Sequence, residues 1–246
     1  MPRLVSTVAP ADGPMDVHLV VPSNTGQPRH PAVLVFQEAF GVNPHILRVC
    51  DRLAAAGYLA VAPELFHRTG RGVQLPYGDF EKVRPILGQL TNAKLLMDVQ
   101  AAHRLLAGRP DVDPRRIAAL GFCMGGFVAA LAACHLPVAA AVSFYGGGLA
   151  RVRPGIGFTP LLEDLARLTA PTLFLFGEQD QGIPPEDVAA VRTSLPARDR
   201  PHEIVVYPGV GHAFFCDERP LYHAATAEIA WLKTMQWLGS HLTSAT

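Results

Sequence analysis

A cysteine with a glycine two residues before it and another two residues after it is the feature of this sequence best suited to covalent chemistry. An apolar run over 116–122 leads into Gly121-Phe-Cys123-Met-Gly125, and small residues typical of a helix follow. This pattern predicts a nucleophile elbow, a sharp strand-to-helix turn that lifts its tip residue above the edge of a sheet. Taken alone, Cys123 also fits a small buried core residue. The glycine spacing favours a nucleophile, because a strained tip needs small neighbours, and a thiol there indicates acyl transfer through a thioester.

A thiol is mostly protonated at neutral pH, so a nucleophilic cysteine needs a base. Asp180 follows an apolar run that ends at Phe176, and His212 follows one that ends at Tyr207. The chain order Cys123, Asp180, His212 is the order that α/β-hydrolase topology requires, with all three at the carboxyl edge of the sheet. We therefore predict that His212 moves the thiol proton and that Asp180 fixes its tautomer. The weaker alternatives for the acid and the base are Glu178, Asp187, His202 and His223.

The segment 37–41, Gln-Glu-Ala-Phe-Gly, ends the first buried strand and predicts the rest of the site. In this architecture that loop gives one oxyanion donor and the residue after the nucleophile gives the other, here the backbone N–H groups of Ala39 and Met124. Glu38 lies beside them. A carboxylate at this place needs a partner or a role. It either forms a salt bridge to Arg68 or Arg84, or acts beside the thiol.

Strands that alternate with helices must position these residues. An N-terminal antiparallel hairpin is expected over 4–8 and 17–21, separated by Asp-Gly-Pro at 12–14. The remaining strands are expected at 32–36, 58–62, 116–122, 138–142, 171–176 and 203–207. A helix is expected from Pro44, after an Asn43 cap, to about Ala56. Further helices are expected over 91–107, from the elbow to about Cys134, after the Pro-Pro-Glu opening at 184–186, and over 221–238, where Gly239 ends the helix. The sequence therefore predicts an α/β fold, a mostly parallel sheet with helices on both faces, in one domain over 1–246.

Residues 66–90 contain several glycines and prolines, so an irregular loop is expected there. A long loop in a compact chain is often functional, and this one is interpreted as a possible lid over the site. The glycines at 146–148 lack the lysine of a phosphate loop and are interpreted as a flexible rim.

Composition excludes several other classes of function. The formal net charge is +0 and no basic run stands out, so no nucleic-acid partner is expected. Polar residues and a proline interrupt the most apolar stretch, 127–145, and the N-terminus lacks a signal-peptide core, so neither a membrane span nor secretion is expected. The four cysteines form no CxxC pair, which indicates free thiols in a reducing cytoplasm. The ten histidines show no ligand spacing, so no metal is expected.

Four motifs together resemble the dienelactone hydrolase family, the carboxymethylenebutenolidases. They are the segments 37–43, 121–126 and 177–180 and the Gly-His-Ala-Phe sequence over 211–214. The resemblance covers nearly the whole chain in order. It implies an α/β-hydrolase fold, a Cys123–His212–Asp180 triad, and no metal or organic cofactor. It also implies that Glu38 touches the resting thiol and helps generate the thiolate when substrate arrives. The substrate implied is a small lactone or ester, and the protein a monomer or small homo-oligomer.

The family holds its substrate carboxylate with arginines, one of them a few residues after the catalytic histidine. The residues that directly follow His212 are Ala-Phe-Phe-Cys-Asp, with no arginine among them, while Arg84 lies near the region of the other family arginine. A more apolar pocket is therefore expected, shaped by Tyr145, Phe214, Phe215 and the 66–90 loop.

Two other classes of function remain open. A glutamine amidotransferase also uses a cysteine elbow, but Phe127 stands where that pattern has glutamine, and Ala-Phe follows His212 where it has His-x-Glu. A binding or scaffold protein that keeps the fold without activity is the non-enzymatic alternative.

Overall fold

The computed structural model describes residues 3–23, 26, 28–196 and 201–242 of the chain. Among these residues, eight strands form one sheet in the order β1-β2-β4-β3-β5-β6-β7-β8. The strands are β1 (Arg3–Val8), β2 (Met15–Val20), β3 (His30–Phe36), β4 (Leu59–Pro63), β5 (Val112–Phe122), β6 (Ala140–Phe144), β7 (Thr172–Gly177) and β8 (His202–Tyr207). β1 pairs antiparallel with β2, and β2 with β4, while every other neighbouring pair is parallel. The predicted α/β fold with an N-terminal antiparallel hairpin is thus confirmed.

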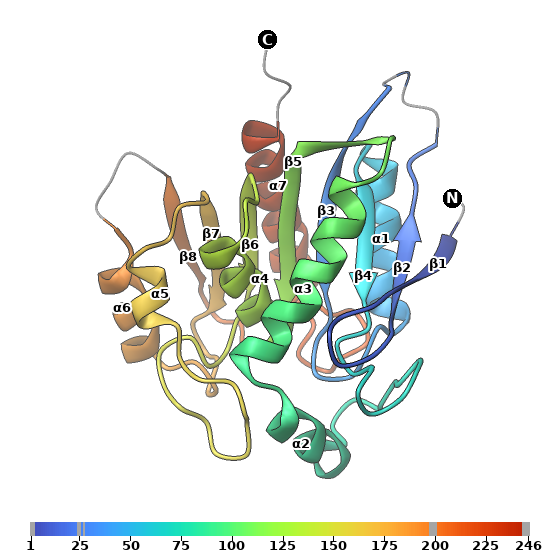
Figure 1. Cartoon of the computed structure of the whole chain (residues 1–246). Helices are drawn as coiled ribbons and strands as arrows, with labels where there is room; N and C mark the ends of the chain where they lie inside the picture. The colour runs from blue at the N-terminus through green and yellow to red at the C-terminus, as the bar shows by residue number, and fades with distance from the viewer. Residues whose placement is uncertain (1–2, 24–25, 27, 197–200, 243–246) are drawn as a thin grey trace.

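Helices cover both faces of the sheet (Figure 1). They are α1 (Pro44–Ala55), α2 (Phe80–Gln89), α3 (Asn92–Ala107), α4 (Met124–His135), α5 (Leu162–Leu165), α6 (Pro185–Ser194) and α7 (Ala224–His241). In the view of Figure 1, α3 and α4 lie in front of the sheet, and α1 and α7 lie behind it. Since both faces are covered, β3, β4, β6 and β7 consist largely of buried apolar residues. No helix of the described residues is long and apolar enough to span a bilayer.

Local signals set where the helices begin. Asn43 caps α1, because its side chain accepts a hydrogen bond from the Ile46 N–H at 3.2 Å, and Pro44 takes the first helical position. The Thr91 hydroxyl accepts from the Lys94 N–H at 3.3 Å at the start of α3. Both starts agree with the sequence expectation.

Several expectations about elements were wrong, among them the following three. Residues 80–89 of the expected loop form α2, with Pro85 inside the helix. The Asp79 side chain caps this helix by accepting from the Lys82 N–H, and that cap outweighs the glycine and proline signals around it. α7 continues through Gly239, where an added Cβ would meet nothing within 4 Å, so the helix simply tolerates the glycine. β6 begins at Ala140 rather than at 138, because a run of alanines sets no clear strand boundary.

Candidate active site

Cys123 lies at the turn between β5, which ends at Phe122, and α4, which begins at Met124. Its backbone has φ 55° and ψ −115°, a conformation that residues other than glycine rarely adopt. An added Cβ on Gly121 would lie 1.9 Å from the Gly125 carbonyl oxygen, and one on Gly125 would lie 2.2 Å from the Phe36 carbonyl oxygen. Backbone therefore packs on backbone around the thiol, and no larger residue fits at either glycine.

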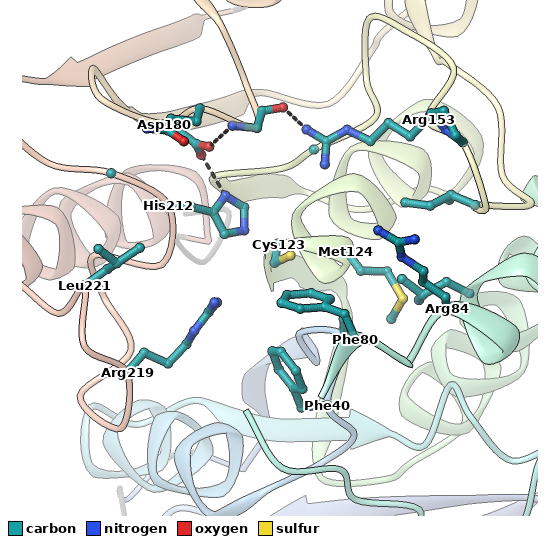
Figure 2. Close-up of a pocket in the computed structure, with 18 of the residues that line it drawn as sticks. Phe40, Phe80, Arg84, Cys123, Met124, Arg153, Asp180, His212, Arg219 and Leu221 are labelled. Atoms are coloured by element: carbon teal, nitrogen blue, oxygen red, sulfur yellow. Dashed lines mark hydrogen bonds and ion pairs between the residues drawn. The ribbon is translucent and has the colours of Figure 1, made fainter. Parts of the chain in front are cut away.

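Asp180 and His212 form a close hydrogen-bonded pair at the carboxyl edge of the sheet. The Nδ1 atom of His212 lies 2.7 Å from Oδ2 of Asp180. The other carboxylate oxygen accepts a hydrogen bond from the Gly182 N–H at 2.8 Å. Asp180 is buried, and Figure 2 shows the imidazole between Asp180 and Cys123. With Nδ1 held by the acid, the Nε2 side of the ring is left for the thiol.

The environment of His212 favours the protonated imidazole. Burial lowers its pKa, but the negative charge of Cys123 and the contacts with Asp180 raise it more, and the pKa reaches about 10. An imidazolium beside a thiolate is the pairing that makes a cysteine nucleophilic at neutral pH.

A cavity of about 680 Å³ opens over Cys123 and His212. Its walls come from the loops after β3, β7 and β8, from α2, and from the segment 147–158. Ala39 and Met124 both line it, and neither backbone N–H donates a hydrogen bond to another described residue. The two expected oxyanion donors thus lie at the same cavity as the thiol.

Glu38 is fully buried, and neither of its carboxylate oxygens has a hydrogen-bond partner among the described residues. The expected salt bridge to Arg68 or Arg84 is not formed. Arg68 instead binds Asp12 and Asp98. The cation nearest Glu38 is Arg219, whose Nη1 lies 3.7 Å from Oε1.

Arg219 corrects the expectation of a pocket without an arginine after His212. It lines the cavity seven residues beyond the histidine, with 13% of its side chain exposed. The guanidinium also packs over the ring of Phe40, with its central carbon 5.4 Å from the ring centroid. Arg219 stands seven residues after His212, beyond the motif that immediately follows the histidine. Arg153, on the segment after β6, also lines the cavity and was not anticipated.

Tyr145 and Phe214 do not line the cavity, so their expected role in substrate contact was wrong. Both side chains are fully buried and pack on each other, with ring centroids 5.4 Å apart. Positive φ angles at Tyr145 (37°) and Ala213 (62°) accompany this inward course of the two loops. Phe215 is likewise in the core, stacked on Phe122 at 5.2 Å. Arg84, from α2, does line the cavity as expected.

The alternatives to the acid and the base have other partners. Asp187 pairs with Arg151, Glu178 accepts from the Gly209 N–H, and His223 caps α7. None of the four alternative residues is part of the cavity wall.

One group of possible metal ligands occurs elsewhere among the described residues. Single ligand atoms of Asp12, His67 and Asp98 lie within 4.8 Å of one another. The Arg68 guanidinium binds both carboxylates, at 2.6 Å and 2.7 Å, so a cation already neutralises this group.

Comparisons with known proteins match the chain to one family over most of its length. The sequence profile of the dienelactone hydrolase family matches residues 15–242. The chain is 35% identical over 227 residues to a Synechocystis protein named "Putative carboxymethylenebutenolidase", covering 92% of this chain and 91% of the other. A Yersinia pestis protein of the same name is 40% identical over 220 residues, with coverages of 88% and 80%. Among solved structures, a "Putative Dienelactone Hydrolase" from Klebsiella pneumoniae has 33% identity and a TM-score of 0.85, covering 97% of this chain and 99% of the other.

Proposed function

The chain belongs to the dienelactone hydrolase family, and from that premise we propose that it hydrolyses a small lactone or ester through a thioester on Cys123. One observation carries the proposal. The Asp180–His212 pair, joined at 2.7 Å, faces the same cavity as a cysteine held at the tip of a strained strand-to-helix turn. A buried structural thiol needs none of these neighbours.

In the first half of the proposed reaction, the thiolate sulfur attacks the carbonyl carbon of the substrate. The carbonyl oxygen becomes an oxyanion, which accepts hydrogen bonds from the N–H groups of Ala39 and Met124. The carbon–oxygen bond to the ring or leaving group then breaks. The departing oxygen takes a proton from the His212 imidazolium, which leaves a thioester on Cys123 and a neutral imidazole.

In the second half, His212 accepts a proton from water, and the resulting hydroxide attacks the thioester carbonyl. The carbon–sulfur bond breaks, the acid product leaves, and the thiolate–imidazolium pair is restored. Asp180 keeps the same tautomer and ring orientation through both halves. Every proton moved in this scheme passes through His212, so the chain supplies the acid–base chemistry from its own side chains.

We propose that Glu38 assists before these two halves, when the Cys123 thiol passes its proton to His212 and the thiolate–imidazolium pair first forms. Its burial without a hydrogen bond, and its ion pair with Arg219 at 3.7 Å, support a carboxylate that can exchange partners when substrate enters. The test is alkylation of Cys123 by iodoacetamide with and without a substrate analogue. Glu38→Gln should abolish the acceleration caused by the analogue, and acceleration equal to wild type in that variant would contradict the role.

The location and assembly of the protein remain proposals. All four cysteines are free thiols, which supports function in a reducing cytoplasm. The substrate is proposed to be a small molecule that reaches the thiol through the cavity, and the protein a monomer or small homo-oligomer.

The direct test is hydrolysis of short p-nitrophenyl esters and simple lactones by the wild-type protein and Cys123→Ala. We expect the variant to lose turnover by at least about 10³-fold, because the covalent route is removed. Cys134→Ala is the matched control, since this thiol lies at the far end of α4 and burial raises its pKa to about 12. Undiminished turnover in Cys123→Ala would contradict the proposal and favour an activity that does not use this thiol.

A further inference from the structure

The oxyanion donor proposed at Ala39 depends on the orientation of one peptide plane, in the loop that follows β3. The Ala39 N–H donates to none of the described residues, so no contact on that side fixes the plane of the Glu38–Ala39 peptide. This peptide is trans, and the carbonyl oxygen and the N–H of a trans peptide point in opposite directions within one plane. Whatever holds the Glu38 carbonyl oxygen therefore also decides where the Ala39 N–H points.

The Glu38 carbonyl oxygen is held by the side chain of Gln37. Nε2 of Gln37 donates to this oxygen at 3.4 Å, and Oε1 accepts from the Leu65 N–H at 3.2 Å, just after β4. The side chain is fully buried and does not line the cavity. A primary amide can donate to a carbonyl with one end and accept from an N–H with the other. Gln37 thus ties the peptide of the oxyanion donor to the end of a neighbouring strand.

The backbone of Gln37 also contacts the other half of the oxyanion site. An added Cβ on Gly125, which directly follows Met124, would lie 2.6 Å from the Gln37 carbonyl oxygen. The turn that carries the Met124 N–H and the peptide that carries the Ala39 N–H are therefore supported by the same residue. Oxyanion donors act at about 2.7–3.1 Å from the developing charge, so a common support keeps both donors in the relation that the transition state needs.

Gln74 makes a similar bond to the same loop, but on a peptide that has no part in the cavity. Its Nε2 donates to the Val42 carbonyl oxygen at 2.9 Å. The N–H of that peptide belongs to Asn43 and donates to the Gly41 carbonyl oxygen at 3.0 Å. Neither Val42 nor Asn43 lines the cavity. The chain therefore contains two comparable glutamines, one on the donor peptide and one on a neighbouring peptide.

We propose that Gln37 is a positioning residue, which aims the Ala39 N–H at the oxyanion by holding the Glu38 carbonyl group. The inference rests on the proposed hydrolysis at Cys123 and adds to it a residue that does not line the cavity. Without the amide, the buried carbonyl loses its donor and the peptide plane turns toward another one, which takes the N–H away from the cavity. The loss affects the transition state and not substrate binding, because the charge on the substrate oxygen develops only there.

The first test compares Gln37→Met with Gln74→Met in the hydrolysis of p-nitrophenyl pentanoate. Methionine keeps the length of the side chain and removes both of its hydrogen-bonding groups. We expect Gln37→Met to lower kcat and kcat/KM together by about tenfold to a hundredfold, less than the loss of a whole oxyanion donor, with KM near wild type. Gln74→Met should stay close to wild type. Equal values of kcat in the two variants would overturn the proposal.

An infrared measurement separates positioning from general damage and does not depend on ester hydrolysis. In an Asp180→Asn background, Cys123 is acylated with cinnamoyl imidazole that carries an isotope label at its carbonyl, and the carbonyl stretch of the thioester is recorded. Hydrogen bonds from the two N–H groups lower this frequency relative to that of the unfolded protein. Gln37→Met should remove about half of the lowering, because one of two donors is lost, whereas Gln74→Met should retain it.

This measurement distinguishes the failure of the positioning role from the failure of the hydrolytic proposal. A full lowering in Gln37→Met would overturn the role of Gln37 even if hydrolysis at Cys123 is established. A reduced lowering would support it even if the natural substrate is not an ester. Gln37→Glu serves if Gln37→Met does not fold, because its ionised carboxylate still accepts from the Leu65 N–H but cannot donate to the Glu38 carbonyl. A full lowering in folded Gln37→Glu at alkaline pH would likewise contradict the proposal.

Discussion

The two sides of the cavity are built from different kinds of contact. The reaction edge is made of Cys123, Asp180, His212 and the turn around Gly125. Asp180 is buried, Cys123 and His212 are partly buried, and the turn packs backbone against backbone. The rim, made of α2 and the segment 153–158, faces solvent and contributes mostly side chains. A larger residue at a glycine of the elbow disturbs the chain itself, whereas a change to an exposed side chain of the rim alters what the cavity presents. The comparison indicates that the chemistry is fixed by the backbone and the substrate preference by replaceable side chains.

Removing the acid tests the reaction edge most severely. Asp180→Asn keeps the shape of the side chain but favours the wrong imidazole tautomer, so we expect kcat to fall by about 10⁴-fold with little change in KM. Steady-state hydrolysis of p-nitrophenyl pentanoate measures it. Asp187→Asn, at a carboxylate that pairs with Arg151 instead, should stay close to wild type. Equal losses in the two variants would show that the acid is misassigned.

Crowding the elbow tests whether its backbone contacts tolerate any side chain. In Gly125→Ala, the new Cβ would lie 2.2 Å from the Phe36 carbonyl oxygen, so the turn must move. We expect the free energy of unfolding to fall by about 1–3 kcal/mol, the usual effect of overpacking, with loss of activity. Gly239→Ala is the control, because nothing lies within 4 Å of its Cβ, and it should stabilise α7 by about 0.5–1 kcal/mol. Urea unfolding measures both, and wild-type stability in Gly125→Ala would contradict this account of the elbow.

The raised pKa of His212 predicts a pH dependence of stability. Folding raises this pKa from 6.5 to about 10, so the folded state favours the charged imidazole. The resulting stabilisation is complete below pH 6.5 and is lost as the pH rises through about 10. Wild type should therefore lose more stability between pH 7 and pH 10 than His212→Gln, in which this titration is absent. Parallel declines in denaturant midpoint for the two proteins would show that folding does not perturb this histidine.

The rim should give the smallest effects and leave the chemistry intact. Phe80 is 48% exposed and touches Phe40 edge-on, with ring centroids 5.9 Å apart. Phe80→Ala removes apolar contact with the substrate, so we expect KM to rise severalfold, about 1 kcal/mol of binding, with kcat near wild type. Leu232→Ala, at an exposed position of α7 away from the cavity, controls for general effects. A fall in the kcat of Phe80→Ala as large as that of Asp180→Asn would contradict the assignment of Phe80 to substrate binding alone.

The reaction edge was predictable because its signals are local and ordered. Gly121 is required by its close approach to Gly125 within the turn, and Gly125 by its close approach to the end of β3. Both glycines fall within five consecutive residues. Asp180 and His212 follow strands whose order along the chain fixes which edge they share. Topology therefore predicts that the two residues lie near each other, and the structure joins their side chains at 2.7 Å.

The rim was less predictable because it depends on which way side chains face. Phe214 stands two residues after His212, yet the positive φ of Ala213 accompanies a turn of the chain that buries it. The glycines and prolines around α2 predicted an irregular loop, but the Asp79 cap and the packing of Val83 and Ile86 stabilise a helix there. Arg153 enters the cavity from an irregular segment without a periodic pattern.

The most direct test of the central claim is to trap the acyl group on the sulfur. Asp180→Asn is mixed with p-nitrophenyl pentanoate, quenched in acid within one turnover, digested and analysed by mass spectrometry. The account predicts a pentanoyl mass increase on the peptide that contains Cys123, and removal of the label by hydroxylamine as expected for a thioester. Release of nitrophenol without an adduct on that peptide, or with the adduct on another residue, would contradict it.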